Sequence, residues 1–195
     1  MSILELKAKV KSHLLTKICT SVAGSDTTAG GIRATLLYII TNPRVYQSLV
    51  TEILNAQLSS PVRDSEAKQL PYLQAVIREG LRMHPPVAAL MSKVVPAGGD
   101  NFDGRFVPAG TKISYSAWGV YRNKKVWGED ANTFRPERWL HGSPEKIKEL
   151  KEIWEFIFGG GRYKCLGQNV ALMEINKVIV EVSLSPNDIL YSGTR

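Results

Sequence analysis

Cysteine is scarce in this chain of 195 residues, which contains only Cys19 and Cys165. The two cysteines are far apart in the sequence and have very different neighbours. Two such residues cannot form a disulfide framework or a zinc cluster. A reducing compartment is therefore the default expectation.

Long apolar stretches are also absent. The longest lies around Leu36–Ile40 and is too short to span a bilayer. The first fifteen residues mix acidic and basic side chains with apolar ones, so they lack the apolar core of a signal peptide and do not form a membrane anchor. We therefore expect a soluble chain with no membrane span.

The charge balance is basic, with a formal net charge of +7. Such a balance suits an acidic redox partner, an anionic membrane surface or a nucleic acid. The lysines and arginines are scattered, and no basic run has interleaved aromatic residues, so we expect no nucleic-acid partner. A hydrophobic fraction of 44% and a charged fraction of 22% are typical of a globular domain.

The patterning predicts a mainly α fold with a small antiparallel β-sheet. Apolar residues at helical spacing and proline or Asn-Pro boundaries predict the helices, which cover 2–42, 43–57, 71–84, 146–154 and 166–184. Three strand-like pieces, separated by glycine turns, predict the sheet; they are 91–95, 101–107 and 111–118. We expect 59–68 to be a polar connection and 123–143 to be irregular.

The middle of the long first helix has poor helix propensity. Residues 23–31 contain three glycines and the adjacent pair Thr27 and Thr28. We expect the helix either to be kinked here or to be approached closely by another part of the structure.

The strongest chemical signal surrounds Cys165, in the run Phe-Gly-Gly-Gly-Arg-Tyr-Lys-Cys-Leu-Gly over 158–167. The cysteine comes at or just before the start of a helix, where free backbone N–H groups and the helix dipole stabilise negative charge. Arg162 and Lys164 add to that effect, and the glycines allow the backbone to approach a large flat partner. A sulfur anion in this setting is a nucleophile or a metal ligand.

Local chemistry leaves three interpretations of this cysteine open. A nucleophile needs a nearby base, and the three histidines, His13, His84 and His141, have no evident partner motif. A thiolate ligand to haem iron fits best, because such a ligand pushes electron density onto the metal. The third interpretation is a buried structural cysteine after a glycine turn.

The run 158–167 resembles the haem-thiolate loop of the cytochromes P450. The resemblance implies that Cys165 holds the iron of haem b. Many relatives place a basic residue, which contacts a haem propionate, at the position of Tyr163, and here Arg162 is a substitute. The other cofactor-binding residues implied in the loop are Phe158, Gly159, Gly161 and Gly167.

Two further motifs occur in the order expected for this family. Glu79 and Arg82 are three residues apart on one helix face and can pair. They resemble the Glu-x-x-Arg motif of the cytochromes P450, which implies a structural network with Arg138 of the Pro-Glu-Arg-Trp segment.

The other motif lies in the long helix. An acid followed by a hydroxyl, here Asp26 and Thr27, can relay a proton if the helix opens locally, although the pair can also merely loosen a surface helix. The resemblance implies that Asp26 and Thr27 deliver protons during oxygen activation. It also implies that Ala23 and Gly24 lie over the porphyrin face.

The resemblance implies the C-terminal part of the cytochrome P450 fold, truncated, with an atypical tail after Glu181. We expect a fragment, a truncated gene product or an incorrectly assigned gene. The segments of the expected single partial domain are a central helix (1–42), following helices (43–86), a small β region (87–122), a meander (123–157), the haem-thiolate loop with the last helix (158–182) and the tail (183–195).

The implied function is that of a haem-dependent monooxygenase that inserts one oxygen atom from O2 into a small apolar organic substrate. The motifs resemble fungal members that act in secondary metabolism. The implied electron donor is an NADPH-dependent reductase, so NADPH is not bound by this chain. Full-length eukaryotic relatives lie at the endoplasmic reticulum membrane, but the compartment of this chain is left open. The alternative is a truncated, non-catalytic remnant that binds haem weakly or not at all.

Overall fold

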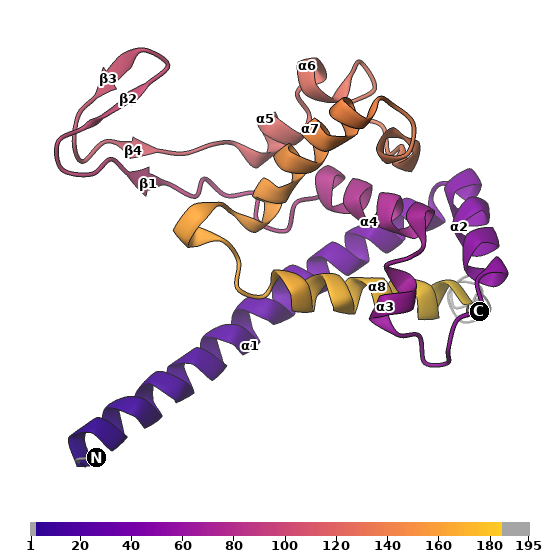
Figure 1. The fold of residues 1–195 in the computed structure, drawn as a ribbon, viewed down its shortest axis with the longest axis horizontal. Helices are drawn as coiled ribbons and strands as arrows, with labels where there is room; N and C mark the ends of the chain where they lie inside the picture. The colour runs from indigo at the N-terminus through magenta and orange to yellow at the C-terminus, as the bar shows by residue number, and fades with distance from the viewer. Residues whose placement is uncertain (1–2, 185–195) are drawn as a thin grey trace, which may run out of the picture. The chain divides into compact units, whose positions relative to one another are not determined.

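The computed structural model describes the backbone of residues 3–184 and the side chains of residues 21–184. The part of the predicted tail from Ser185 onward lies outside these residues. The chain forms two compact units, Met1–Pro86 with Phe134–Arg195, and Val87–Thr133. The architecture is mainly helical, with short antiparallel strands confined to the second unit (Figure 1), which confirms the predicted fold class.

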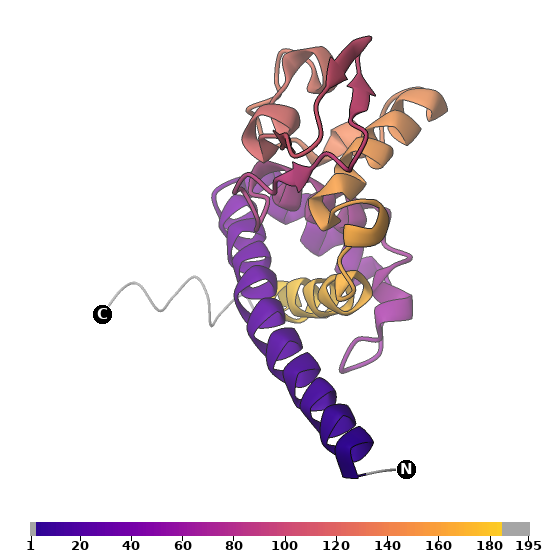
Figure 2. The ribbon, with the colours of Figure 1, turned by 90° about the vertical axis from the view of Figure 1, so that its left-hand side faces the viewer.

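The first unit is a helical assembly built around α4. Helix α4 packs against α1, α2, α8 and the short helix η1. Helix α1 also packs against α8, which it crosses in Figure 1 and which lies beside it in Figure 2. The elements of this unit are α1 (Ile3–Ile40), α2 (Pro43–Asn55), α3 (Asp64–Ala67), α4 (Pro71–Met83), η1 (Pro136–Trp139), α7 (Pro144–Glu155), η2 (Phe156–Phe158), η3 (Gly161–Tyr163) and α8 (Gln168–Leu184).

The central position of α4 explains its burial. Pro71 begins the helix, and the carboxylate of Glu52 in α2 accepts hydrogen bonds from the backbone N–H groups of Tyr72 and Leu73 at 2.8 Å. This carboxylate satisfies two N–H groups that a helix start leaves without partners. From Glu79 to Met83 every residue of α4 is buried, because other elements cover it on several sides.

Helix α1 runs without interruption through the glycine-rich patch. A Cβ atom added at Gly31 would lie 2.9 Å from the side chain of Leu81, whereas one added at Gly24 or Gly30 would meet nothing within 4 Å. A reciprocal contact occurs at Gly80 of α4, where a Cβ would lie 2.3 Å from the hydroxyl oxygen of Thr35. Among the three glycines of the patch, close approach by another element therefore occurs at Gly31.

The second unit contains two separate two-stranded sheets in place of the single small sheet expected. Strand β1 (Lys93–Val94) pairs with β4 (Lys112–Ile113), and β2 (Asp100–Phe102) pairs with β3 (Arg105–Val107), both antiparallel. The predicted Asp103-Gly104 turn joins β2 to β3 with positive φ at both residues, as a tight hairpin requires. Helices α5 (Ala117–Tyr121) and α6 (Lys124–Trp127) complete the unit.

The sequence did not predict α3, which forms within the segment expected to be a polar connection. The carboxylate of Glu66 accepts hydrogen bonds from the backbone N–H groups of Arg63 and Ser59 at 3.1 Å, and from the hydroxyl of Ser59 at 2.7 Å. These bonds satisfy donors at the start of the helix, which is why so short a helix forms.

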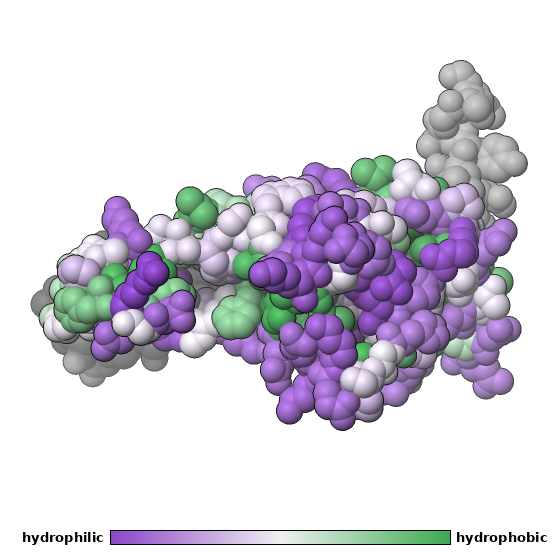
Figure 3. All heavy atoms as spheres, turned by 90° about the horizontal axis from the view of Figure 1, so that it is seen from above, coloured by the Kyte–Doolittle hydropathy of each residue, from purple (hydrophilic) through white to green (hydrophobic). Residues whose placement is uncertain are grey.

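Hydrophilic side chains cover most of the face shown in Figure 3, and hydrophobic ones gather there in small patches. Within residues 3–184, no helix is both long enough and apolar enough to cross a membrane.

Candidate functional site

A buried ion cluster centres on Glu79 of α4. Glu79 and Arg82 lie one turn apart, and both are 0% exposed. The Nε and Nη2 atoms of Arg82 donate to the two carboxylate oxygens of Glu79 at 2.9 and 2.8 Å. This two-point contact is the strongest geometry for an arginine–carboxylate pair.

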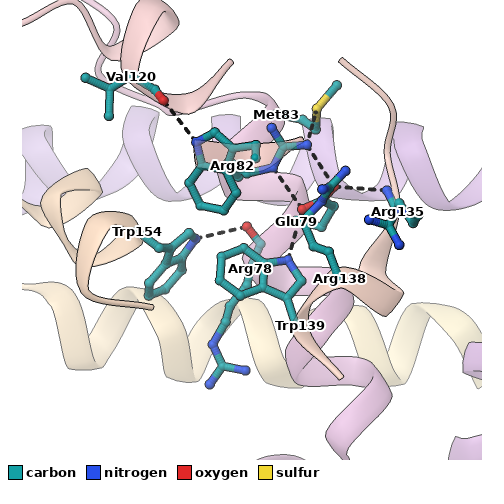
Figure 4. Close-up of polar contacts among 10 residues, drawn as sticks. Arg78, Glu79, Arg82, Met83, Val120, Arg135, Arg138, Trp139 and Trp154 are labelled. Carbon is teal, nitrogen blue, oxygen red and sulfur yellow. Dashed lines mark hydrogen bonds and ion pairs between the residues drawn. The ribbon is translucent and has the colours of Figure 1, made fainter. Parts of the chain in front are cut away.

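Helix η1 and the residue before it supply the remaining donors (Figure 4). Oε1 of Glu79 accepts from Nε of Arg138 and from the backbone N–H of Arg135, both at 2.9 Å. Oε2 accepts from Nε1 of Trp139, also at 2.9 Å. The structure thus brings the predicted residues Glu79, Arg82 and Arg138 together in one cluster, and it adds Trp139 and a backbone amide.

This cluster has a structural character, because both carboxylate oxygens of Glu79 are engaged and no part of Glu79 is exposed. A charge can be buried only if it is paired and hydrogen-bonded, and removing one partner leaves the others uncompensated. Glu79 therefore fixes η1 on α4.

A second, more exposed cluster extends from η1 through Glu137. The carboxylate of Glu137 pairs with the guanidinium of Arg44 in α2 and accepts a hydrogen bond from the hydroxyl of Tyr72 at 2.9 Å. Burial opposes ionisation of Glu137, but the hydrogen bonds from Arg44 and Tyr72 outweigh it and lower the pKa of this carboxyl. Burial, followed by the bond to Glu137, raises the pKa of Tyr72 to about 12.

The loop that carries Cys165 is closed by its own backbone. The N–H of Cys165 donates to the carbonyl oxygen of Phe158 at 2.7 Å. Gly159 has a φ of +75°, and a Cβ added there would lie 2.7 Å from the carbonyl oxygen of Tyr163. Only glycine fits such a position, so the second residue of the predicted pattern is required by the turn itself.

The Cys165 side chain is exposed and lies three residues before the start of α8. This finding contradicts the interpretation as a buried structural cysteine. The two neighbouring cations have other contacts: Nη2 of Arg162 donates to the hydroxyl of Tyr163 at 2.7 Å, and Nζ of Lys164 lies 3.8 Å from a carboxylate oxygen of Glu155.

The predicted acid–alcohol pair lies on α1. Asp26, Ala23 and Gly24 are exposed, and Thr27 is half-buried. The Thr27 hydroxyl donates to the carbonyl oxygen of Ala23 at 2.7 Å, so in this conformation its proton is directed to its own helix. The segment lies on α1, which packs against α8, the helix that follows the cysteine loop.

A family model for cytochrome P450 matches residues 11–182. The chain belongs to the cytochrome P450 family. The match covers the α1 segment, the Glu79 cluster and the cysteine loop, which are the three places where the sequence resembles the family.

Fungal relatives agree with this assignment, and they confirm the predicted likeness to fungal members. The chain is 47% identical over 165 residues to the cytochrome P450 monooxygenase aba1 of Botryotinia fuckeliana, a match that covers 83% of this chain and 32% of the relative. It is 40% identical over 160 residues to a pisatin demethylase of Fusarium vanettenii, covering 82% and 30%. It is 40% identical over 179 residues to the cytochrome P450 monooxygenase cfoH of Aspergillus candidus, covering 88% and 33%. The chain spans about a third of the length of these curated relatives.

The haem that this family implies is compatible with the residues present. The thiol of Cys165 is exposed, three residues before the start of α8, so it is accessible to a bound group. The turn at Gly159 keeps the loop compact, and Gly24 is exposed, with no described side chain of another element near an added Cβ.

Sequence reasoning missed the contribution of Trp139 and the backbone amide of Arg135 to the Glu79 cluster. Trp139 directly follows Arg138, which was predicted to join the cluster, and this position could have indicated that the indole also contacts Glu79. No sequence signal points to a backbone amide 56 residues away from its acceptor.

Proposed function

We propose that this chain is part of a haem-dependent monooxygenase and that Cys165 is the thiolate ligand of the iron. The observation that carries the proposal is the exposed Cys165 side chain, presented by a backbone-closed loop directly before α8. Haem, when bound through a thiolate, supplies the activation of dioxygen that oxygen insertion needs.

Residues of the loop serve the cofactor in different ways. Gly161 and Gly167 leave space for the porphyrin, and Phe158 gives the loop its apolar base. Arg162 is the propionate partner, in place of the basic residue that relatives carry at the position of Tyr163. The guanidinium has five N–H donors, and only its Nη2 is seen to donate to the Tyr163 hydroxyl, so the other donors can reach a propionate.

On α1, Ala23 and Gly24 are small enough to face the porphyrin, and Asp26 and Thr27 carry the protons. The Thr27 hydroxyl must rotate away from the Ala23 carbonyl oxygen, to which it donates at 2.7 Å, before it can donate elsewhere. The exposed carboxyl of Asp26 then supplies a proton from solvent.

The substrate that we propose is a small apolar organic molecule of fungal secondary metabolism, and the electron source is an NADPH-dependent reductase. One relative is named for the demethylation of pisatin, an oxidation of an organic molecule. That name supports an organic substrate for this chain, and pisatin itself is not proposed.

An absorption spectrum of the purified full chain tests the ligation. The chain is supplied with haem, reduced and exposed to carbon monoxide. We expect the strongly red-shifted Soret band of thiolate ligation, and we expect Cys165→Ser to lose it while Cys19→Ser keeps it. Loss of turnover in Thr27→Ala, with the band retained, tests the proton relay.

An ordinary ferrous–CO band in the wild-type chain, or no retained haem, contradicts this proposal. It favours the second candidate, a non-catalytic remnant that binds haem weakly or not at all. The exposure of Leu166 (103%) and Val170 (53%) beside the cysteine favours that candidate, because neighbouring exposed apolar side chains mark surfaces that need a partner.

A further inference from the structure

The loop that carries Cys165 depends on its two ends for its position. The side chains of residues 160–166 are all exposed. The bonds that close the loop are backbone bonds, among them the one from the Cys165 N–H to the Phe158 carbonyl oxygen at 2.7 Å. Between exposed side chains, the contact of Lys164 Nζ with Glu155 at 3.8 Å adds little. The loop is therefore held in place mainly by α8 at one end and by Phe158 at the other.

Trp154 of α7 anchors Phe158. Its side chain is buried, with 6% exposed. Its ring meets the Phe158 ring edge-on, with centroids 5.7 Å apart at 67°, and its Nε1 donates to the carbonyl oxygen of Arg78 in α4 at 2.9 Å. The hydrogen bond restricts rotation of the indole, so its orientation toward the Phe158 ring is fixed.

Trp139 connects Trp154 to the buried ion cluster. The two indole rings lie 6.5 Å apart at 75°, which is within the favoured edge-to-face range. Nε1 of Trp139 donates to Oε2 of Glu79 at 2.9 Å, and Figure 4 shows both indole N–H groups directed toward α4. Three aromatic rings thus lead from Glu79 to the start of the cysteine loop.

We propose that Trp154 is a positioning residue for Cys165. It transmits the fixed position of the Glu79 cluster to Phe158, whose carbonyl oxygen holds the Cys165 N–H. The proposal rests on the proposed function, in which Cys165 binds the iron. Without the indole, the turn at Phe158 moves and the hydrogen bond from the Cys165 N–H to the Phe158 carbonyl oxygen breaks. The position of the Cys165 sulfur relative to α8 is then no longer fixed.

Hydrogen exchange on the full chain without haem is the first test. In Trp154→Leu we expect the Cys165 amide to exchange about tenfold faster or more, since the opening is local, while amides of α2 and α4 keep their protection. Trp154→Phe, which keeps a ring and loses the N–H, should give a smaller increase. Trp118→Leu is the matched control, because Trp118 is an exposed tryptophan of the second unit.

Unchanged Cys165 exchange in Trp154→Leu overturns the proposal. Equal acceleration throughout α2 and α4 also overturns it, because Trp154 would then be an ordinary core residue. Should Trp154→Leu unfold the chain, Trp154→Phe decides by the same two criteria.

The second test is spectroscopic and uses the haem-loaded chain under carbon monoxide. We expect the thiolate Soret band of Trp154→Leu to convert to the ordinary ferrous–CO band about tenfold faster than that of the wild type, for the same local reason. Equal rates contradict the positioning role. If the wild type itself lacks the thiolate band, the proposed function fails, and hydrogen exchange alone decides the role of Trp154.

Discussion

The Glu79 cluster and the Cys165 loop both depend on polar chemistry, but the protein holds them in opposite ways. Glu79 is 0% exposed, and side chains and a backbone amide surround its carboxylate. The Cys165 side chain is exposed, and backbone hydrogen bonds close its loop. A buried charge needs hydrogen-bond and ion-pair partners from the protein itself. A reactive side chain must stay accessible, so it is positioned by the backbone and the residues that support it.

The largest effect is expected when the buried cluster loses its anion. Glu79→Gln removes the negative charge that compensates Arg82 and Arg138. Its side-chain NH2 group also replaces an oxygen that accepts hydrogen bonds, so it faces donors with which it cannot bond. We expect a loss of about 3–5 kcal/mol in the free energy of unfolding, measured by urea denaturation.

Glu149→Gln is the matched control, because it removes the same charge from an ion pair with Lys146 in which both side chains are about half exposed. Its cost should be about 0.5 kcal/mol or less. Similar losses in the two variants would show that burial does not set the value of the Glu79 cluster.

A smaller effect is expected where α4 meets α1. In Gly80→Ala the new Cβ would lie 2.3 Å from the Thr35 hydroxyl oxygen, so the two helices must move apart. We expect a destabilisation of about 1–3 kcal/mol, visible as a lower thermal midpoint. Gly30→Ala should instead stabilise by about 0.5–1 kcal/mol, because its Cβ meets nothing within 4 Å and alanine favours a helix. If the two substitutions both stabilise or both destabilise the protein, the close contact between Gly80 and Thr35 is contradicted.

The half-exposed Glu137 cluster should contribute to stability in a pH-dependent way. Because the folded pKa of Glu137 is lowered, its contribution is present above the pKa of a free glutamate, about 4.3, and is lost as the pH falls through the folded value. The cost of Glu137→Gln should therefore be at most about 1 kcal/mol near neutral pH and should shrink in acid.

Thermal midpoints of wild type and Glu137→Gln across this range check the expectation. Some acid sensitivity should remain in the variant, because the pKa of Asp64 is also lowered: burial opposes the shift, and hydrogen bonds from Lys68 and Asn176 outweigh it. A constant difference between the two proteins at all pH values would contradict the assignment to Glu137.

The smallest effect on stability is expected at the exposed cysteine. Cys165→Ser should change the free energy of unfolding of the haem-free chain by no more than about 0.5 kcal/mol, as is usual for surface positions, and yet abolish thiolate ligation. Urea denaturation measures the free energy of unfolding, and the carbon monoxide spectrum of the same preparation measures thiolate ligation. A large loss of stability without haem would mean that the cysteine is structural.

Much of the fold was predictable from local sequence. The boundaries of α2 and α4 follow from Pro43 and Pro71, and the hairpin turn follows from Asp103-Gly104, because these signals act on the residues that carry them. Helix α3 was missed because its start depends on Glu66 capping backbone groups as far back as Ser59, a pattern with no strong propensity signal.

Some parts of the candidate site were predictable from the sequence, and others were not. The Glu79–Arg82 pair is visible as a spacing of three on one helix, and the cysteine loop is visible as a run of ten residues. The bond from Trp154 to Arg78 joins residues 76 positions apart, and no local pattern encodes it.

The sequence by itself determined the starts of α2 and α4, the turn glycines and the order of the three family motifs, since each of these depends on neighbouring residues. It did not determine α3, α6 or η1, which form in segments expected to be a connection or irregular. Only the tertiary structure decided which glycine of α1 is approached closely, which donors surround Glu79 and how Trp154 connects that cluster to the cysteine loop. Those contacts join residues distant in the chain, and they exist only because α4 is packed between its neighbours.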